Sequence, residues 1–326
     1  MGTEPPPCTD ALIAEAVDAV RGARQIALAC HVNPDGDALG SMLALLHVLR
    51  AAGRDVVASF PTPFRTAPHY RDLPGLDLLV APDDFPAEPD VMITFDCGSL
   101  SRLGDLEPAA KGARQLVVID HHISNQCYGT INLVDPKAAA SGVVVQTLID
   151  ALELPLNRDA AVCLYAALIC DTGRFQYETT TPEVFDLARR LTEFDVPITE
   201  LSRSLFEEHR FAYLQLLGEA LAHAELVRER HLVWTAVTQD MLGRHGVTID
   251  EVEGLIDILR RTAEAEVTCV LKEEEDGTIR VSLRSLGGID VRRVAEAHGG
   301  GGHRFAAGFS SDQDLPTVVA RITAAL

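Results

Sequence analysis

The chain has 326 residues, 47% of them hydrophobic, and a formal net charge of −20 at pH 7. This length and hydrophobic content are sufficient for two domains, each with its own core. The acidic balance, without a basic stripe, argues against a protein that holds long nucleic acid by neutralising its phosphates. We therefore expect no long duplex nucleic acid as a partner, whereas a small anionic ligand held at one place is compatible with the composition.

The cysteines and the absence of targeting signals indicate a cytoplasmic globular protein. Residues 1–10 are rich in proline and lack the basic and apolar regions of a signal peptide. No apolar run approaches the roughly 18 residues of a membrane span, so no membrane partner is expected. The seven cysteines include no C-x-x-C pair, and we expect them to be reduced residues of the core.

Helices and short apolar strands alternate in the first part of the chain. Hydrophobic residues on one face predict a helix at 10–22, and a second helix is expected to end near Gly53. The predicted strands are 26–30, 56–60, 76–80, 91–95 and 115–119. Continuous apolar runs of this length are typical of the buried strands of a parallel sheet.

Further helices are predicted after these strands. Ser141 is a candidate N-cap of a helix that continues to Leu152, and Asp159 is a candidate start of the next helix. Thr181 and Pro182 have the sequence of an N-cap followed by proline at the first helical position. The stretch 183–230 is charged, and we expect it to be mostly helical and to contain no strand.

The last part of the chain has an α/β pattern of its own. The expected elements are strands at 232–237, 266–271 and 279–284 and helices at 249–260 and 291–298. Asp276 and Gly277 predict a hairpin turn between the last two of these strands. The chain is therefore expected to be an α/β protein with a parallel-sheet domain at 10–195, a helical connector at 196–228 and a smaller α/β domain at 229–326.

Polar residues gather directly after the apolar segments of the first domain. They are His31, Asp35, Asp37, Asp96, Asp120, His121, His122 and Asp171. The carboxyl ends of parallel strands share one edge of a sheet, where α/β proteins bind ligands, so these side chains should meet. Taken alone, each aspartate could simply cap a helix.

So many carboxylates at one place would repel one another unless cations neutralised them. One divalent cation would leave several of these ligands unused, whereas two cations about 3.5 to 4 Å apart would bind all of them. Such a pair of cations would hold a phosphoryl group for in-line displacement. The mixture of His and Asp ligands favours manganese over magnesium or calcium, and cobalt, iron or zinc could compete. The expected reaction is the hydrolysis of a phosphoester.

These motifs resemble the DHH phosphoesterase superfamily with its DHH-associated C-terminal domain. The matching residues are His-x-Asn-Pro-Asp-Gly-Asp at 31–37, Asp96, Asp-His-His at 120–122, Asp171 and Gly-Gly-Gly-His at 300–303. The segments 281–285 and 306–309 resemble the nano-RNase and pAp phosphatase branch, to which actinobacterial cyclic dinucleotide phosphodiesterases are related.

The resemblance implies a role for each position of the metal site. One ion is held by His31 and Asp35, the other by Asp37, His121 and Asp171, and Asp96 bridges them. Asp120 fixes the tautomer and orientation of His121 from outside the metal site.

The resemblance also implies which residues face the substrate. His122 contacts the scissile phosphate or protonates the leaving oxygen, and Asn33 orients the first loop. In the second domain the substrate is held by Arg284, Ser285, Gly300, Gly301, Gly302 and His303. Consecutive glycines expose N–H groups to an anion, and a guanidinium group can bind phosphate in a bidentate manner.

The implied activity is that of a manganese-dependent phosphodiesterase and phosphatase acting on short oligoribonucleotides, pAp and cyclic dinucleotides such as c-di-AMP, or linear pApA. Two alternatives remain: a cyclic dinucleotide sensor without turnover, and a RecJ-like single-strand exonuclease. The intact ligand positions argue against a sensor, and the short two-domain chain argues against RecJ. Family members often pair through the first domain, so a homodimer is expected.

Overall fold

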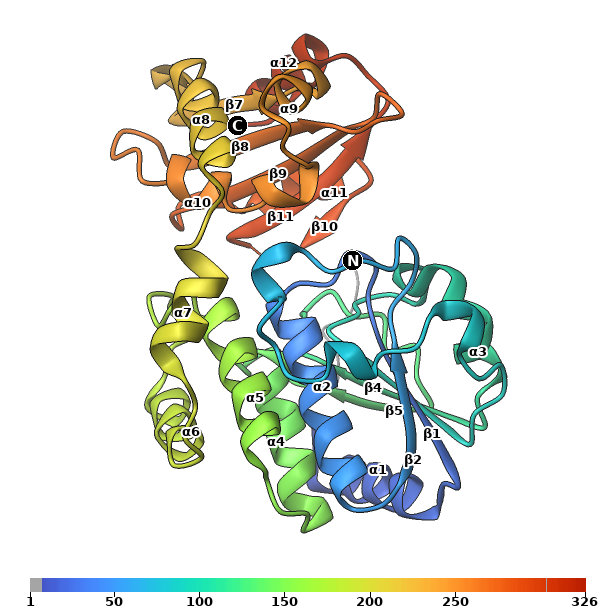
Figure 1. The fold of residues 1–326 in the computed structure, drawn as a ribbon. Helices are drawn as coiled ribbons and strands as arrows, with labels where there is room; N and C mark the ends of the chain where they lie inside the picture. The colour runs from blue at the N-terminus through green and yellow to red at the C-terminus, as the bar shows by residue number, and fades with distance from the viewer. Residues whose placement is uncertain (1–7, 303) are drawn as a thin grey trace. The chain divides into compact units, whose positions relative to one another are not determined.

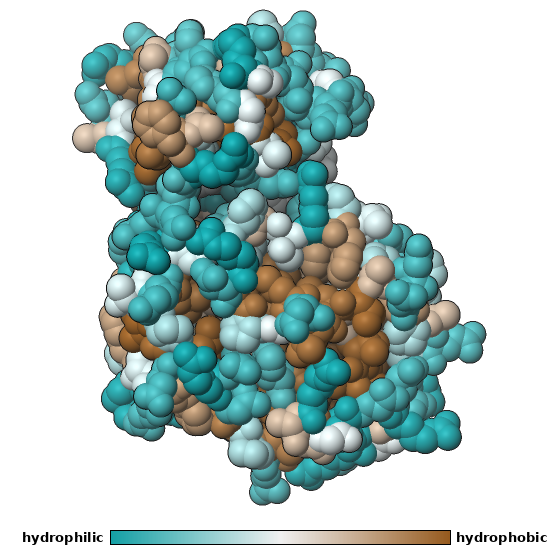
Figure 2. Space-filling model, in the orientation of Figure 1, coloured by the Kyte–Doolittle hydropathy of each residue, from teal (hydrophilic) through white to brown (hydrophobic). Residues whose placement is uncertain are grey.

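The computed structural model describes residues 8–302 and 304–326, and the chain divides into two compact units (Figure 1). The first unit ends at Leu205 and the second begins at Phe206, inside the stretch that was predicted to be a helical connector. No described helix is both long enough and apolar enough to cross a membrane. In Figure 2, hydrophilic residues cover most of the visible surface, and hydrophobic residues gather on the visible face of the first unit.

The first unit contains a sheet of five parallel strands in the order β2-β1-β3-β4-β5. The strands are β1 (Gln25–Cys30), β2 (Asp55–Ser59), β3 (Val91–Phe95), β4 (Gln115–Asp120) and β5 (Ile131–Val134). The strand order reverses at β1, which pairs with β2 on one side and with β3 on the other. Such a reversal opens a crevice at the carboxyl ends of the two central strands, and open α/β sheets bind their ligands there.

Helices cover both faces of this sheet. On one face α1 (Asp10–Gly22), α2 (Gly36–Ala51) and α4 (Ser141–Leu152) contact the strands, and α5 (Arg158–Asp171) packs against α2 and α4. Helix α6 (Pro182–Thr192) packs against α5, and the remaining helices of the unit are α3 (Glu107–Gly112) and α7 (Ile198–Phe206). Helix α2 packs against both α4 and α5 (Figure 1). The opposite face is covered by α3 and the 3-10 segment η4 (Leu100–Leu106), whose apolar residues pack on Ala27 and Ala29 of β1.

The predicted strand at 76–80 is wrong. Leu76–Leu78 forms a single 3-10 turn, one of three short turns (η1 Pro68–Tyr70, η2 Leu76–Leu78 and η3 Pro82–Asp84) between β2 and β3. Gly75, just before η2, has φ 93°. This left-handed conformation is that of a turn, so the chain is not extended where the predicted strand would start. One hydrogen bond, from Val80 N to Ala58 O, joins this stretch to the end of β2.

Two predicted helix starts are also corrected. Ser141 is the first residue inside α4, and the cap position belongs to Ala140. Helix α5 is capped by Asn157, whose side chain accepts a hydrogen bond from Ala160 N, and not by Asp159. Thr181 does occupy the N-cap position of α6, with Pro182 after it.

The second unit has a six-stranded mixed sheet in the order β10-β11-β9-β8-β7-β6. The strands are β6 (Glu225–Val227), β7 (Leu232–Val237), β8 (Val267–Glu273), β9 (Ile279–Ser285), β10 (Gly301–Gly302) and β11 (Ala306–Ser311). Strands β7 and β8 are parallel, and the other neighbours are antiparallel. The predicted hairpin between β8 and β9 is confirmed.

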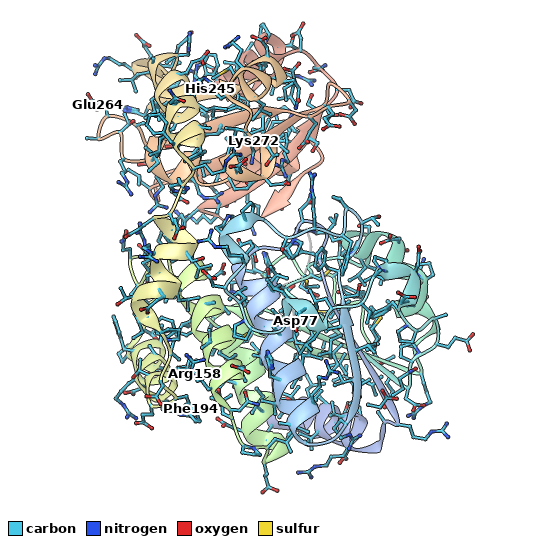
Figure 3. The ribbon with its side chains drawn as sticks, viewed as in Figure 1. Asp77, Arg158, Phe194, His245, Glu264 and Lys272 are labelled. Carbon is cyan, nitrogen blue, oxygen red and sulfur yellow. The ribbon has the colours of Figure 1, made fainter. Side chains whose placement is uncertain are left out.

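Helices bury both faces of the second sheet. Helices α8 (Phe211–Ala222), α9 (Gln239–His245) and α10 (Leu255–Leu259) form a core with one face, and α11 (Val291–Glu296) and α12 (Leu315–Ala325) form a core with the other. Two short 3-10 segments, η5 (Arg228–Arg230) and η6 (Ile249–Val252), complete the unit. Lys272 of β8, labelled in Figure 3, is buried and forms an ion pair of 2.7 Å with Glu253.

The structure differs from the sequence prediction here as well. The predicted helix at 249–260 is two pieces, η6 and α10, which Gly254 separates, in agreement with the low helix propensity of glycine. Helix α8 belongs to the core of the second unit, so the predicted connector is not one separate segment. The predicted glycine-rich loop contains the edge strand β10, whose Gly301 pairs with Gly308.

Candidate metal centre

The loop between β1 and α2 places Asp35 at the start of a helix. Its Oδ1 accepts hydrogen bonds from the backbone N–H groups of Asp37 (3.1 Å) and Ala38 (3.0 Å), so Asp35 is the N-cap of α2. Capping uses one carboxylate oxygen and leaves the other for a ligand. Asn33 precedes it with φ 51°, a left-handed conformation that asparagine tolerates well. Its side chain is exposed, so the clearest role of Asn33 is to shape the loop.

Asp37 is fully buried and is held by three hydrogen bonds. Its Oδ1 accepts from Ser41 Oγ (2.9 Å) and from Gly142 N (3.1 Å), and its Oδ2 accepts from Ser141 N (2.6 Å). The last two donors are the first N–H groups of α4, so the positive end of that helix dipole points at the carboxylate. Helix α4 therefore fixes the position of a side chain that lies more than 100 residues earlier in the chain.

Asp96 follows β3 directly and lies among three imidazole rings. Its Oδ2 is 3.5 Å from His31 Nε2, and its Oδ1 is 3.6 Å from His121 Nε2 and 3.3 Å from His122 Nδ1. The hydroxyl of Ser141 donates a further hydrogen bond of 3.0 Å to Oδ1. Because its two oxygens face different histidines, Asp96 is placed to contact two cations at once.

The structure corrects the role expected for Asp120. Its Oδ1 accepts hydrogen bonds from the backbone N–H groups of His121 (2.7 Å) and His122 (3.1 Å), and it lies 2.7 Å from His122 Nδ1. The ring of His121 is instead oriented by the carbonyl oxygen of Ala138, 3.1 Å from its Nδ1. Asp120 therefore orients His122.

Asp171 completes the cluster from the last turn of α5. One of its oxygens lies 3.0 Å from His121 Nε2, which is also 3.7 Å from Asp37 Oδ2. A carboxylate at a helix C-terminus faces the negative end of the helix dipole, which is unfavourable without a neighbouring positive charge. A cation between these three side chains would supply that charge.

The side chains form two groups that suit a divalent cation. The groups are His31, Asp35 and Asp96, and Asp37, His121 and Asp171. In each group the ligand atoms lie within 4.8 Å of one another, which fits metal–ligand bonds of about 2.0 to 2.4 Å. A third group, Asp96 with His121 and His122, overlaps the other two. The donor set is a mixture of carboxylate oxygen and imidazole nitrogen, as first-row divalent metals prefer.

The charges of the cluster depend strongly on one another. Burial, together with Asp96 and Asp171, raises the pKa of Asp37 well above its usual value. Burial acts against protonation of His121, yet the carboxylate of Asp171 raises its pKa to about 10. For Asp96, burial is likewise outweighed, and the positive charge and hydrogen bond of His122 hold its pKa well below the usual range. The site therefore contains protonated groups where a cation could take the place of protons.

Two residues of the site were missed as functional from the sequence. Ser141 was expected to be a helix cap only, and its contacts with Asp37 and Asp96 carry no sequence signal beyond a serine at a helix start. Arg102 likewise lies outside the motifs named above. Its Nη2 lies 2.9 Å from His31 Nδ1. The Nδ1 atom of His31 also lies 2.8 Å from the carbonyl oxygen of Val32.

The residues predicted to hold substrate lie in the second unit. Arg284 lies near the C-terminal end of β9, is partly buried, and pairs along the backbone with Ala306 of β11. The hydroxyl of Ser285 already donates to Glu266 Oε1 (3.1 Å) and accepts from Gly287 N (3.1 Å). His303 lies outside the described residues.

The glycines at 300–302 have steric reasons of their own. A Cβ atom at Gly300 would clash with the carbonyl oxygen of Gly308, and at Gly302, whose φ is 136°, it would lie 2.5 Å from Ala306 O. At Gly301 a Cβ atom would meet open space. Two of the three glycines therefore allow β10 to lie close to β11, whether or not a ligand binds there.

Comparison with known proteins identifies two family domains in the chain. Residues 25–168 match the model of the DHH family, N-terminal domain, and residues 233–326 match the DHHA1 domain. A relative from Thermus thermophilus, named bifunctional oligoribonuclease and PAP phosphatase NrnA, is 32% identical over 306 residues, which cover 91% of this chain and 86% of the relative. The protein of the same name from Bacillus subtilis is 30% identical over 284 residues, 86% of this chain and 87% of that protein.

The fold is shared with a solved structure. The crystal structure of an exopolyphosphatase-related protein from Bacteroides fragilis superposes with a TM-score of 0.89 over 97% of this chain and 96% of the other, at 23% sequence identity. This likeness concerns the fold, because the sequence identity is low.

Proposed function

Because the chain belongs to the DHH family and carries a DHHA1 domain, we propose that it is a two-metal phosphodiesterase and phosphatase that hydrolyses short oligoribonucleotides and pAp. The observation that carries the proposal is the pair of ligand groups on either side of Asp96. The substrates are those in the names of the Thermus and Bacillus relatives. Cyclic dinucleotides and linear pApA are further substrates under this proposal.

Two divalent cations, in our proposal Mn²⁺, are held by the two groups of side chains. His31 and Asp35 hold one, Asp37, His121 and Asp171 hold the other, and Asp96 contacts both. When bound, such a pair of cations neutralises the charge that develops on a phosphoryl group and lowers the pKa of a water molecule. The carbonyl oxygen of Ala138 supports this assignment for His121, because it lies beside Nδ1 and leaves Nε2 for the metal.

His122 is the proton donor to the leaving oxygen. In the metal-free site burial opposes its protonation, but the carboxylates of Asp96 and Asp120 raise its pKa well above the usual value. Its Nδ1 is held by Asp120 at 2.7 Å, which leaves Nε2 to face a substrate. Asp120 acts through His122 as a positioning residue.

Arg284 and the glycines of β10 bind the end of the nucleotide that lies away from the scissile phosphate. Residues 10–195 carry the metal chemistry, residues 229–326 bind the substrate with Ser285 and His303 as further contacts, and residues 196–228 connect the two. A cytoplasmic homodimer is part of the same proposal, and light scattering on the purified chain tests the dimer.

A product assay tests the activity. Purified protein with manganese is given pAp, a linear RNA dinucleotide and c-di-AMP in parallel, and the products are separated by chromatography. We expect mononucleotide from the linear dinucleotide, AMP and phosphate from pAp, and no product after chelation of the metal. Tight binding of one substrate without turnover would favour the sensor and overturn the proposal.

A pair of variants ties the activity to the metal centre. Asp96→Asn keeps the shape of the side chain and suits the left-handed backbone (φ 53°), but it removes the charge that faces both cations. We expect kcat to fall by about a thousandfold or more. The control is Asp77→Asn, an exposed residue of η2 that Figure 3 labels. Near wild-type turnover of Asp96→Asn at saturating manganese would contradict the assignment.

A further inference from the structure

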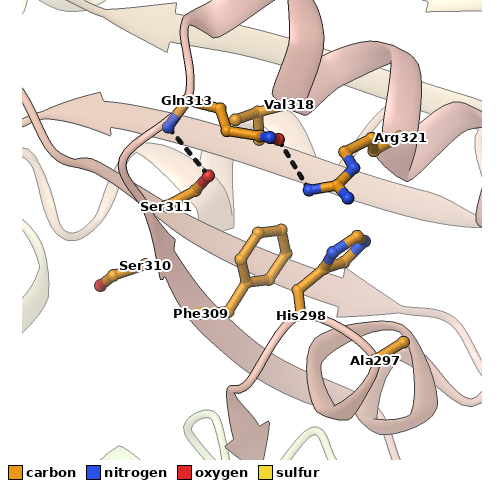
Figure 4. A pocket seen from close by; sticks show the side chains of 8 residues that line it. All are labelled: Ala297, His298, Phe309, Ser310, Ser311, Gln313, Val318 and Arg321. Carbon is orange, nitrogen blue, oxygen red and sulfur yellow. Dashed lines mark hydrogen bonds between the residues drawn. The ribbon is translucent and has the colours of Figure 1, made fainter.

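A pocket of about 270 Å³ lies in the second unit, between the end of α11, β11 and α12 (Figure 4). Its lining residues are Ala297, His298, Phe309, Ser310, Ser311, Gln313, Val318 and Arg321. None of them belongs to the metal centre or to the residues to which the proposed function assigns substrate binding. The pocket is smaller than most drug-sized ligand sites, and its size suits a phosphate ester or a mononucleotide.

His298 presents a buried polar atom to this pocket. Its ring stacks on Phe309, with the ring centroids 4.6 Å apart. Its Nε2 is buried and has no hydrogen-bond partner among the described residues. A buried polar atom without a partner is costly, and in native structures it usually marks a bound water or ligand.

Arg321 supplies the positive charge. Its Nη1 donates a hydrogen bond of 2.7 Å to Gln313 Oε1, which holds the guanidinium group over the pocket and leaves its remaining N–H groups for a ligand (Figure 4). The hydroxyl of Ser311 accepts from Gln313 N (3.2 Å), so its own hydrogen is free to be donated. Arg321 and Ser311 thus each have a hydrogen left to donate to a ligand.

The charge of the lining contrasts with that of the whole chain. The sequence has 48 acidic and 28 basic residues, yet the described residues that line the pocket include a guanidinium group and no carboxylate. Asp312 and Asp314 flank the lining, and the Oδ1 of Asp314 is used to cap α12 at Thr317 N (2.8 Å). A pocket with an arginine, an imidazole and hydroxyl groups in an acidic protein selects for an anion.

We propose that the pocket formed by His298, Ser311 and Arg321 binds the phosphoryl group of a small ligand, either inorganic phosphate or a phosphate monoester such as a nucleotide. Arg321 contacts two phosphate oxygens, His298 Nε2 donates to one of them, and the hydroxyl of Ser311 donates to another. All contacts come from the second unit, so binding does not require the metal centre and does not depend on the proposed activity.

Titrations of the full-length protein test this site. Inorganic phosphate, AMP and adenosine are added to protein with histidine labelled by ¹⁵N, with manganese and again after chelation. We expect the imidazole signals of His298, assigned by their loss in His298→Gln, to shift with phosphate and AMP but not with adenosine. The dissociation constant should be about 1 mM or lower, with or without manganese.

Matched variants make the result specific to the pocket. Arg321→Gln should weaken binding about tenfold or more, because a charge-assisted contact is lost. Arg230→Gln, an exposed arginine elsewhere in the same unit, should bind as the wild type does. Thermal unfolding of both variants checks that they are folded. If a variant is not folded, the titration of the wild-type protein still tests the site.

The outcomes separate the ligand classes. Binding of AMP alone assigns the site to nucleotides, whereas binding of both AMP and phosphate assigns it to the phosphoryl group. The inference is overturned if the His298 signals do not move, which would mean that water alone fills the pocket. It is also overturned if adenosine binds as well as AMP does, or if Arg321→Gln leaves the affinity unchanged.

Discussion

His121 is the residue at which proton and metal compete most directly. Asp171, at 3.0 Å, raises the pKa of His121 to about 10 against the effect of burial, so without metal the ring is protonated at neutral pH. An imidazole must be neutral to bind a cation, so each cation bound here displaces a proton. Below the pKa, the neutral fraction falls tenfold for each unit of pH.

We therefore predict that manganese binds more tightly as the pH rises from about 6 to about 9, by up to about tenfold per unit. Calorimetry in buffers of different ionisation enthalpy measures both the affinity and the number of protons released. The number of protons released per bound cation should be close to one if only His121 loses a proton. It should be larger if Asp37, whose pKa is also raised, loses a proton as well. An affinity that does not change with pH, with no proton released, would show that His121 is not a ligand.

Ser141 affects the metal centre without binding metal. Its hydroxyl donates to Asp96 and its backbone N–H donates to Asp37, so it orients one ligand of each group. Ser141→Ala removes the first contact and keeps the second. We predict that manganese affinity falls about 10- to 100-fold, the usual cost of losing a hydrogen bond to a metal ligand.

The control for this variant lies on the same helix. Among the described residues, the hydroxyl of Thr147 in α4 donates to Val143 O of the same helix, and the side chain is exposed, so Thr147→Ala should leave manganese affinity unchanged. The thermal midpoint of metal-free Ser141→Ala measures any general damage. Equal metal affinities of Ser141→Ala and the wild type would mean that Asp96 is oriented by its other neighbours.

At the scale of elements, the spacing of the ligands depends on the packing of α2 against α5. Helix α2 begins beside Asp37, and α5 ends at Asp171, so the two helices carry two ligands of the same group. Gly40 lies at their contact, where a Cβ atom would clash with Cys163 O and lie 2.9 Å from Ala167 N. No larger residue fits this contact unless the helices separate.

Gly40→Ala should therefore lower the free energy of unfolding by about 1 to 3 kcal/mol, as overpacking of a core usually does. The matched control is Gly218→Ala in α8, where a Cβ atom would meet nothing within 4 Å. That variant should gain about 0.5 to 1 kcal/mol from the better helix propensity of alanine. Denaturant unfolding measures both, and equal stabilities of Gly40→Ala and the wild type would show that α2 and α5 can move apart freely.

The elements that the sequence predicts well are those whose signal is local. Strand β1 and the strands after it are apolar runs that turn residues interrupt, and the polar residues that follow them are visible in the sequence. The stretch 76–80 is rich in leucine, as a buried strand would be. It forms a turn because Gly75 has a positive φ, which the sequence pattern does not reveal. Strand β5 has only four residues, too few for a clear pattern.

The site itself was predictable in its residues but not in its supporting contacts. The motifs predict which side chains gather, and the structure brings them together in two groups. The contact of Ser141 with Asp37 spans 104 residues, and that of Ala138 with His121 depends on the path of the chain after β5. Contacts of this kind follow from the packing of whole elements, so a local pattern does not contain them.

At the scale of the whole molecule, the proposed chemistry and the proposed substrate contacts belong to different units. The two groups of metal ligands lie before Leu205, and Arg284 lies after it. A change in the second unit should therefore alter substrate binding and leave the metal in place. This separation distinguishes a true substrate contact from a residue that only stabilises the fold.

We predict that Arg284→Ala raises the KM for pAp about tenfold or more, because a charge-assisted contact with phosphate is lost, while kcat and the manganese content change little. Arg261→Ala is the control, since Arg261 is an exposed arginine of the same unit. Steady-state kinetics and metal analysis of the purified variants measure these quantities. A KM equal to that of the wild type would remove Arg284 from the substrate site. Loss of manganese would mean that the second unit supports the metal centre directly, and the division of roles between the units would then be wrong.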